Sequence, residues 1–551
     1  MFLPALLLIH LSNFIYFSTA SPVDEVPRNP VADALRATPT ARIDAGVIIG
    51  TTTTVQGATA AVNQFLGIPY ASAPTGTARF SPPRPPAAWN ATLDTKKSKS
   101  SCIQVFREYL EEIFGGPKET ESEDCLYLNV FSPRKEWNVA KPSLPILYWL
   151  HPGGSTFGNI AQPMYDGSHF AALEDVIIVT VQYRLDVFGF PQSPDISNLT
   201  ERNLGLLDQR AGLDWIHRNI KNFGGDASRI TVFGASFGGA STDALVASYP
   251  ADSEPPFHAA ILMSGGYAWF AYQQCNDSDY TPWTTFANAL NCTSLECVKG
   301  KSAADIKAVR RNQPFFFGPA CDNITYVQDP RLRKQAGNFA RVPVMLGSST
   351  GDGSYFIAVV GADVDAYFTT FFPGLTGLKT RAMAAYPIGS GGRVDNFTQL
   401  SEIHTDWNFR CPSFFNAQDS AKFVPTYRYL YNATFPNTRQ TNPNITAIWP
   451  LKYQGAWHTS ELADVFSTFA AAYPSVDAPP EEKALSDIVR GAWAAFAKDP
   501  EKAPVEGWAR VGGVDTDVLS FGTDGESGVG TVKDLIGKCN IWKDFLEANH
   551  L

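Results

Sequence analysis

A serine between two glycines is the first residue in this chain whose setting could support nucleophilic chemistry. Ser236 lies in Gly234–Gly238, a Gly-x-Ser-x-Gly sequence. Between a strand and a helix, such glycines permit the sharp turn that raises the hydroxyl above a sheet. The same pattern recurs around Ser349, at Gly347–Gly351. Small residues that suit a closely packed helix follow the first serine at Gly239–Ala244, whereas Gly-Asp-Gly follows the second. This context favours Ser236.

A serine hydroxyl is a weak nucleophile, so it needs a general base and donors for the oxyanion. In sheets that carry such a turn, the base is a histidine further along the chain. Four histidines satisfy this order, and spacing alone does not choose between them: His258, His404, His458 and His550. Paired glycines at Gly153 and Gly154 directly follow an apolar run. They could present backbone N–H groups to the oxyanion, although an ordinary tight turn explains them equally well.

Apolar runs of strand length recur along the chain and indicate a sheet that is buried on both faces. Such runs are typical of mainly parallel sheets with helices on either side. The runs are Leu144–Leu150, Val176–Gln182, Ile230–Phe233, Ala259–Met263, Val342–Leu346 and Thr426–Tyr431. Between them, residues 206–223 have apolar side chains at helical spacing. The alternation predicts an α/β fold with one large, mostly parallel central sheet flanked by helices.

The composition excludes several classes of protein. The chain has 551 residues, and its formal net charge of −10 argues against a nucleic-acid partner. No basic run would hold an anionic membrane surface. Apolar residues make up 44% of the chain, which is enough for a large buried core. The cysteines do not have the spacing of metal ligands and the histidines are scattered, so we expect no metal and no cofactor.

The first residues predict secretion. Residues 1–17 are largely apolar, and Ser18-Thr19-Ala20 provides small residues at a cleavage position, so residues 1–20 are typical of a signal peptide. A membrane anchor is the alternative, but the stretch is short for a span. We expect residues 21–41 to form an extended lead-in and residues 42–551 to form a single domain.

Two further counts agree with passage through an oxidising compartment. The eight cysteines are an even number, as disulfide bonding requires. The chain also contains eight Asn-x-Ser/Thr sequons, which we expect to be exposed glycosylation sites. They are Asn90, Asn198, Asn276, Asn291, Asn323, Asn396, Asn432 and Asn444.

Several longer stretches resemble the type-B carboxylesterases, a family that includes cholinesterases and fungal secreted lipases. The resemblance extends from about Arg42 to Leu546. The stretches that carry it are Phe65–Ala71, Ala78–Phe80, Glu123–Val130, Asn203–Arg210 and Asn222–Asp226. It implies an α/β-hydrolase fold and a secreted serine ester hydrolase.

The resemblance also implies a role for individual residues. Ser236 falls on the nucleophile, His458 on the general base and Asp352 on the acid. Gly153 and Gly154 fall on the oxyanion hole, together with the backbone N–H of Phe237. Ser264 and Glu461 match residues that lie close to these three in the family.

Three residues depart from the family pattern. Asp352 stands where most members have Glu, although an aspartate can equally orient the histidine and stabilise its cation. Ala235 stands before the nucleophile, where members usually have Glu. Phe237 follows the nucleophile, where a small residue is usual, and we expect its ring to narrow the acyl side of the site.

The resemblance pairs six of the cysteines: Cys102 with Cys125, Cys292 with Cys297, and Cys411 with Cys539. Cys275 and Cys321 remain and are paired by elimination only. The loop that Cys102 and Cys125 close corresponds to the family's lid, and residues 105–114 have one apolar helical face. This face is equally well explained by packing on the core. The loop has no tryptophan with which to hold a quaternary ammonium, so we do not expect choline specificity.

Aromatic residues elsewhere indicate an apolar acyl pocket, although such runs are more often core. They are Tyr267, Trp269, Phe270, Phe315, Phe316 and Phe317. The sequence therefore predicts a secreted serine ester hydrolase that acts through an acyl-enzyme on small esters with an apolar acyl or alcohol part. We expect no nucleic-acid partner and no stable membrane insertion. Two alternatives stay open: an acyl-transferring or rearranging enzyme, and a non-catalytic binding relative.

Overall fold

The computed structural model describes residues 38–106, 120–135, 143–266, 279–474, 476–512, 517–533 and 536–548. Several predictions fall outside these residues: the signal peptide, most of the lead-in, most of the lid, Cys275, Asn276 and His550, together with the aromatic residues Tyr267, Trp269 and Phe270. Residues Thr38–Leu551 make up one compact unit. The division of the chain at residues 20 and 41 stays a prediction.

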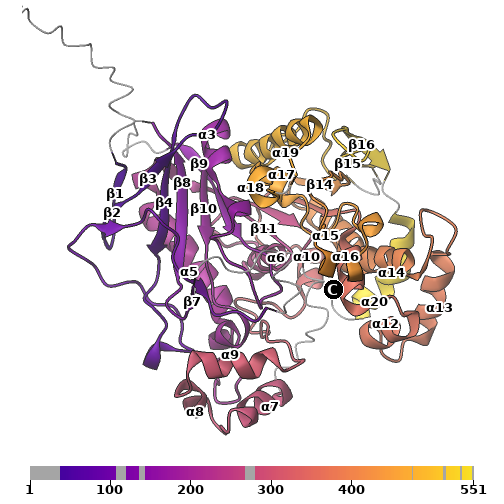
Figure 1. The fold of residues 1–551 in the computed structure, drawn as a ribbon, viewed down its shortest axis with the longest axis horizontal. Helices are drawn as coiled ribbons and strands as arrows, with labels where there is room; N and C mark the ends of the chain where they lie inside the picture. Colours follow the sequence, from indigo (N-terminus) through magenta and orange to yellow (C-terminus); the bar gives the residue numbers. More distant parts are fainter. Residues whose placement is uncertain are drawn as a thin grey trace, which may run out of the picture. The chain divides into compact units, whose positions relative to one another are not determined.

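An eleven-stranded sheet forms the centre of this unit (Figure 1), in the order β16-β15-β14-β13-β12-β11-β9-β10-β8-β4-β3. Its strands from β10 to β15 are parallel, and antiparallel strands extend it at both edges. The strands are β3 (Thr51–Thr53), β4 (Val62–Pro69), β8 (Tyr127–Pro133), β9 (Leu144–Leu150), β10 (Ile177–Val181), β11 (Gly225–Ala235), β12 (Ala259–Met263), β13 (Val344–Ser349), β14 (Thr426–Tyr431), β15 (Asp517–Phe521) and β16 (Val529–Lys533). A smaller sheet contains β1 (Thr40–Ile43), β2 (Gly46–Ile49) and β5 (Leu93–Asp94).

The predicted α/β fold is confirmed, because each predicted apolar run overlaps one of the seven parallel strands. β9, β12 and β14 have the predicted bounds, and the predicted helix begins within α5 (Leu204–Asn219). Alternate side chains of β9 enter different core clusters. Tyr148 packs in the cluster that includes residues of α5 and of α6 (Phe237–Ser248). Trp149 packs in the cluster that includes residues of α3 (Ser168–Glu174), α17 (Leu462–Phe466) and α19 (Pro480–Lys498). Helices therefore cover both faces of the sheet.

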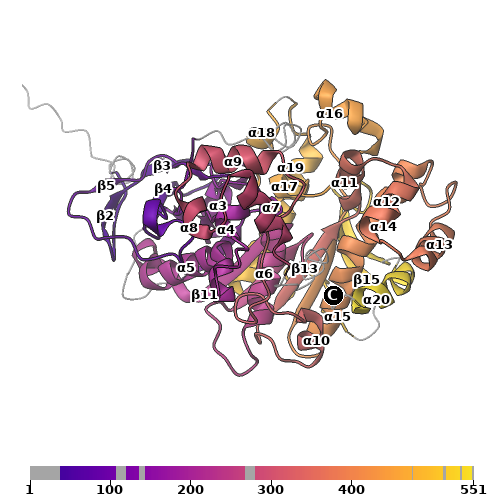
Figure 2. The ribbon, with the colours of Figure 1, turned by 90° about the horizontal axis from the view of Figure 1, so that it is seen from below.

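A third core cluster belongs to a group of helices beyond the sheet. It contains residues of α11 (Asp352–Val360), α12 (Val364–Phe371), α13 (Thr376–Ala385), α14 (Asn396–Thr405), α15 (Cys411–Ala421) and α20 (Cys539–Ala548). A π-helical turn, Asp406–Arg410, joins α14 to α15. Figure 1 and Figure 2 both show α12, α13, α14 and α20 close together.

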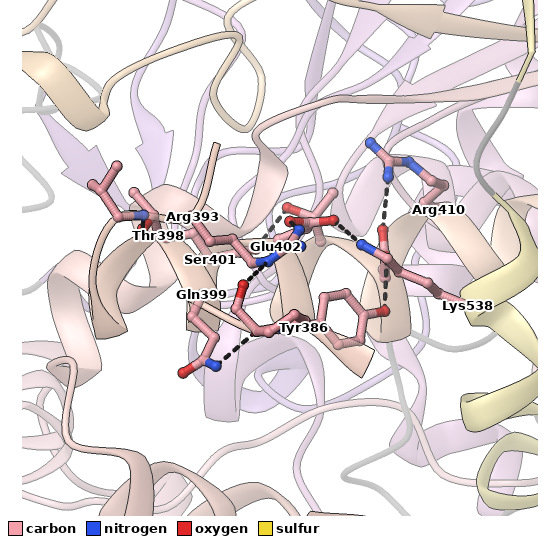
Figure 3. A network of polar contacts seen from close by, with 12 residues as sticks. Tyr386, Arg393, Thr398, Gln399, Ser401, Glu402, Arg410 and Lys538 are labelled. Carbon is pink, nitrogen blue, oxygen red and sulfur yellow. Dashed lines mark hydrogen bonds and ion pairs between the residues drawn. The ribbon is translucent and has the colours of Figure 1, made fainter. Parts of the chain in front are cut away.

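A disulfide and a set of polar contacts join the start of α20 to this group; Figure 3 shows the polar contacts. Glu402 of α14 accepts hydrogen bonds from Arg393 and from Lys538, the residue before α20. The Cys411–Cys539 disulfide lies beside this contact and spans 128 residues of sequence. The start of α20 is therefore fixed to α14 by charge and to α15 by a covalent bond.

The structure contains the other two disulfides implied by the resemblance, Cys102–Cys125 and Cys292–Cys297. Cys321 is also disulfide-bonded, while Cys275, its expected partner, lies outside the described residues. Among the described residues, no helix is both long enough and apolar enough to cross a membrane.

We expect the disulfides to differ in their contribution to stability. Because a longer closed loop restrains the unfolded chain more, Cys411→Ala/Cys539→Ala should lower the free energy of unfolding by about 5 kcal/mol on the entropic model. The control is Cys292→Ala/Cys297→Ala. The disulfide that it removes joins residues only five positions apart, so its loss should lower the free energy of unfolding by about 2 kcal/mol. Urea unfolding measures both values. Equal losses would contradict an origin in loop length.

Candidate active site

The backbone at Ser236 makes a sharp turn between β11 and α6. Ser236 has φ 54° and ψ −121°, a left-handed conformation that costs a non-glycine residue roughly 1–3 kcal/mol. Both flanking glycines are needed for close approach. A Cβ on Gly234 would lie 2.4 Å from the carbonyl carbon of Gly238, and one on Gly238 would lie 1.9 Å from the Leu150 carbonyl oxygen. The Gly-x-Ser-x-Gly sequence therefore forms a strained elbow at Ser236.

The second Gly-x-Ser-x-Gly serine has a different setting. Ser349 is the last residue of β13 and is fully buried. Its hydroxyl donates to Glu461 Oε2 at 3.2 Å, and its backbone N–H donates to Asp352 Oδ2 at 2.9 Å. Ser349 is thus not at an elbow but supports two carboxyl groups.

His458 and Asp352 form a buried pair. His458 Nδ1 lies 2.8 Å from Asp352 Oδ1, and the two side chains are 3% and 0% exposed. The other carboxylate oxygen, Oδ2, accepts hydrogen bonds from the Ser264 hydroxyl and the Ser349 N–H, both at 2.9 Å. With three polar contacts on it, the carboxylate can hold the imidazole in one orientation.

The other two described histidines downstream of Ser236, and the buried Asp406, lie in other settings. His258 Nδ1 contacts the carbonyl of Ile230. Asp406 accepts from Arg410 and from the Tyr386 hydroxyl. His404 is buried near His458, and burial lowers its pKa to about 3, so its imidazole is neutral. None of these three borders the cavity described below.

Aromatic rings surround His458, and sequence reasoning missed them. The ring centroid of Phe409, in the π-helical turn, lies 4.8 Å from that of His458, and the Phe356 centroid lies 5.2 Å away. Phe356 follows Asp352 by four residues, one turn of α11, so helical spacing could have indicated it. No comparable signal pointed to Phe409, because its position depends on the packing of the π-helical turn.

The paired glycines follow β9 as predicted and have positive φ values, 126° at Gly153 and 58° at Gly154. The preceding His151 helps to anchor this loop. Its ring stacks on Tyr183 at 4.2 Å, and its backbone carbonyl accepts from the Tyr183 hydroxyl at 2.6 Å. Burial lowers the pKa of His151 to about 4, so the ring is uncharged.

A single cavity of about 300 Å³ brings the predicted residues together. Ser236, His458, Gly153 and Gly154 all line it. Most other lining residues are apolar or aromatic, and they include Val105, Phe106, Phe157, Tyr165, Phe315, Phe316, Tyr355 and Phe356. The expectation of an apolar pocket thus holds for Phe315 and Phe316. Phe317 is instead fully buried and packs against Phe286.

The expectation for Phe237 is wrong. Its ring is fully buried and does not line the cavity in the described structure. It lies 6.0 Å from the ring of Phe190 and 6.2 Å from that of Tyr183. The side chain at the first position of α6 is directed into the core below the elbow, whereas only the backbone stays near the site.

A second buried carboxyl group lies behind the acid. Glu461 is 1% exposed, and burial together with the nearby Asp352 carboxylate raises its pKa to about 8. Burial also raises the pKa of Glu482 to about 7 and that of Asp464 well above its usual value. Burial therefore disfavours the charged form of the carboxyl groups next to the His458–Asp352 pair.

Comparisons with known proteins agree with this geometry. A family model described as "Carboxylesterase family" matches residues 37–539. The human cocaine esterase is 32% identical over 490 residues, which are 84% of this chain and 84% of that protein. The chain belongs to the carboxylesterase family. The family's α/β-hydrolase fold agrees with the sheet and helices described above.

Other carboxylesterase-family proteins match over similar lengths. The para-nitrobenzyl esterase of Bacillus subtilis (strain 168) is 31% identical over 452 residues, covering 79% of this chain and 86% of that enzyme. The acetylcholinesterase of Bungarus fasciatus is 30% identical over 489 residues, covering 79% of this chain and 75% of that enzyme. The likeness therefore extends over most of the chain and is not confined to the elbow.

The raised pKa of Glu461 gives a stability prediction with a definite sign. A carboxyl group whose pKa is higher in the folded state stabilises the fold at low pH, and this contribution is lost as pH rises from about 4.5 to about 8. Glu461→Gln imitates the protonated group, so the free energy of unfolding should fall less between pH 5 and pH 8 than in the parent. Urea unfolding at both pH values measures this.

A matched control is Glu481→Gln, because Glu481 is exposed on the first turn of α19. This control should keep the parent's pH dependence. If Glu461→Gln also keeps it, Glu461 is ionised in the folded protein and the account of its burial is wrong.

Because the Phe237 ring packs in the core and not in the acyl pocket, its removal should affect stability and not acyl specificity. Phe237→Ala should leave a cavity beneath the elbow and lower the free energy of unfolding by about 3–5 kcal/mol. Turnover should fall by a similar factor for acetate, butyrate and branched esters. Steady-state kinetics on these three esters check the result. A selective gain for the branched ester would indicate that the Phe237 ring lies in the acyl pocket and would contradict its packing in the core.

Proposed function

We propose that this carboxylic ester hydrolase acts through an acyl-enzyme on Ser236, with His458 as general base and Asp352 as the acid that orients it. The observation that carries the proposal is one cavity lined by both Ser236 and His458, with His458 Nδ1 2.8 Å from the buried Asp352 carboxylate. The geometry thus supports the same three residues that the family resemblance implies.

The chemistry follows from the protonation of His458. When Nδ1–H donates to Asp352, the lone pair on Nε2 can take the proton of the serine hydroxyl. The serine oxygen then bonds to the ester carbonyl carbon, and the carbonyl oxygen becomes an oxyanion. We assign its stabilisation to the backbone N–H groups of Gly153, Gly154 and Phe237. Collapse expels the alcohol, which takes the proton from His458, and water releases the acid by the same steps.

The cavity lining supports esters with an apolar acyl or alcohol part. Aromatic and aliphatic side chains dominate the walls around Ser236, and such surface favours apolar groups through their removal from water. No step of this mechanism uses a metal or a cofactor.

Two other functions lead to distinguishable results. A non-catalytic binding relative would have no need for the strained elbow or for the buried His458–Asp352 pair. An acyl-transferring enzyme would use the same acyl-enzyme with an alcohol in place of water, so product analysis in the presence of a small alcohol separates it from a hydrolase.

We also propose that the protein is secreted, with residues 1–20 as its signal peptide and residues 42–551 as one domain. The disulfides and the exposed sequons support this. Six sequon asparagines are exposed: Asn90, Asn198, Asn291, Asn323, Asn396 and Asn444. Asn432 is half-buried, and its side chain accepts from Thr350 and donates to the Gly522 carbonyl, so we propose that this asparagine is unmodified.

The chain itself offers a control for the assignment of Ser236 as the nucleophile, because Ser349 lies in the same Gly-x-Ser-x-Gly pattern. Ser236→Ala should lower kcat for p-nitrophenyl butyrate on the order of 10⁶-fold, because the members of such a triad act as a unit. Ser349→Ala changes the other Gly-x-Ser-x-Gly serine and should keep most of the activity. Release of p-nitrophenol measures both. Full activity in the Ser236 variant would favour the binding-protein alternative.

A further inference from the structure

Two non-glycine residues beside the cavity have left-handed backbone conformations and are bonded to each other. Ser155, directly after the paired glycines, has φ 60°, and Asp186, at the start of α4 (Asp186–Gly189), has φ 48°. The Asp186 N–H donates to the Ser155 carbonyl at 2.6 Å. Strain of this kind persists only where the surrounding structure enforces it, and it concentrates at functional sites.

The Asp186 carboxylate holds an arginine from a distant helix. Arg310, in the last turn of α9 (Ala303–Arg311), donates through Nε to Oδ1 at 2.6 Å and through Nη2 to Oδ2 at 3.0 Å. The two side chains are 1% and 3% exposed, and both residues border the cavity. A buried two-point contact of this kind fixes the orientation of both groups.

The same residues hold the chain that follows α9. Arg310 Nη2 also donates to the Phe315 carbonyl at 2.8 Å, and the guanidinium lies 4.6 Å from the Phe317 ring centroid. The Ser155 hydroxyl donates to the Phe317 carbonyl at 3.0 Å. Residues 313–322 contain no helix or strand, so these side-chain contacts take the place of backbone pairing.

The segment held in this way supplies part of the cavity wall. Phe315 and Phe316 line the cavity that contains Ser236. Phe316 is 39% exposed to solvent. We propose that Ser155, Asp186 and Arg310, here called the clamp, determine specificity for the apolar part of the ester by holding these two rings against the cavity. The inference rests on the proposed ester hydrolysis and deepens it.

The effect of the clamp on specificity depends on contact between the cavity wall and the substrate. A long acyl chain gains affinity only from a wall that stays in place, because ordering a loose segment on binding costs entropy. An acetyl group reaches few of these contacts. The clamp should therefore raise kcat/KM for long acyl esters relative to short ones. One of its three residues, Ser155, directly follows Gly153 and Gly154.

The test measures the ratio of kcat/KM for p-nitrophenyl octanoate to that for p-nitrophenyl acetate. Asp186→Gly/Arg310→Met removes both charges together, and glycine suits the backbone at position 186. The ratio should fall at least about tenfold, the scale at which apolar pockets discriminate, mainly through KM. Phe316→Ala should lower the ratio in the parent protein and change it far less in the clamp variant.

A matched control removes another ion pair, at two residues that do not line the cavity. Arg490 Nε lies 3.1 Å from Glu174 Oε1, with side chains 6% and 16% exposed. Arg490→Met/Glu174→Gln should leave the octanoate-to-acetate ratio unchanged. A fall clearly smaller than tenfold in the folded clamp variant, any rise in the ratio, or an equal fall in the control overturns the proposal.

If the clamp variant does not fold, as thermal unfolding would show, Ser155→Ala removes only the hydrogen bond to the Phe317 carbonyl. It should lower the same ratio at least threefold, and an unchanged ratio overturns the proposal. Ser236→Ala distinguishes failure of the proposed ester hydrolysis from failure of the clamp proposal. If the parent hydrolyses neither ester faster than this variant does, the proposed function and the clamp both fail, whereas active variants with an unchanged ratio remove the clamp alone.

Discussion

The strained backbone at Ser236 is the constraint on which the rest of the site depends. A residue with φ 54° and ψ −121° is held in place only if its neighbours permit no alternative. Here β11 is paired on both sides within the parallel sheet, and α6 packs so closely that its second residue, Gly238, nearly touches the Leu150 carbonyl. The sheet and α6 thus enforce the strained conformation that places Ser236 at the cavity.

Burial organises the groups around this serine. Because His458 and Asp352 are removed from water, their hydrogen bond acts in a medium of low dielectric and is correspondingly strong. The same burial would be costly for several neighbouring negative charges, and Glu461 responds with a raised pKa. The Asp352 side chain, which accepts hydrogen bonds from Ser264 and Ser349, is the carboxyl group that contacts His458.

Those parts of the fold and of the site that depend on local sequence pattern could be predicted from the sequence. Continuous apolar runs identified the strands, and the small residues after Ser236 separated it from Ser349. Histidine spacing left four candidates, and only the family resemblance chose His458. Phe237 was misplaced because the direction of a side chain at a strained turn depends on the surrounding core. Phe409 and the Asp186–Arg310 pair join residues far apart in sequence, so their contacts exist only in the folded protein.

The most direct test of the account is covalent labelling of the nucleophile. The protein would be treated with a p-nitrophenyl alkylphosphonate, digested and examined by mass spectrometry, since such reagents phosphonylate an activated serine and release p-nitrophenol. The account predicts one adduct per chain, on the peptide that contains Ser236, with loss of activity in proportion to labelling. An adduct on Ser349, or full labelling without loss of activity, would contradict it.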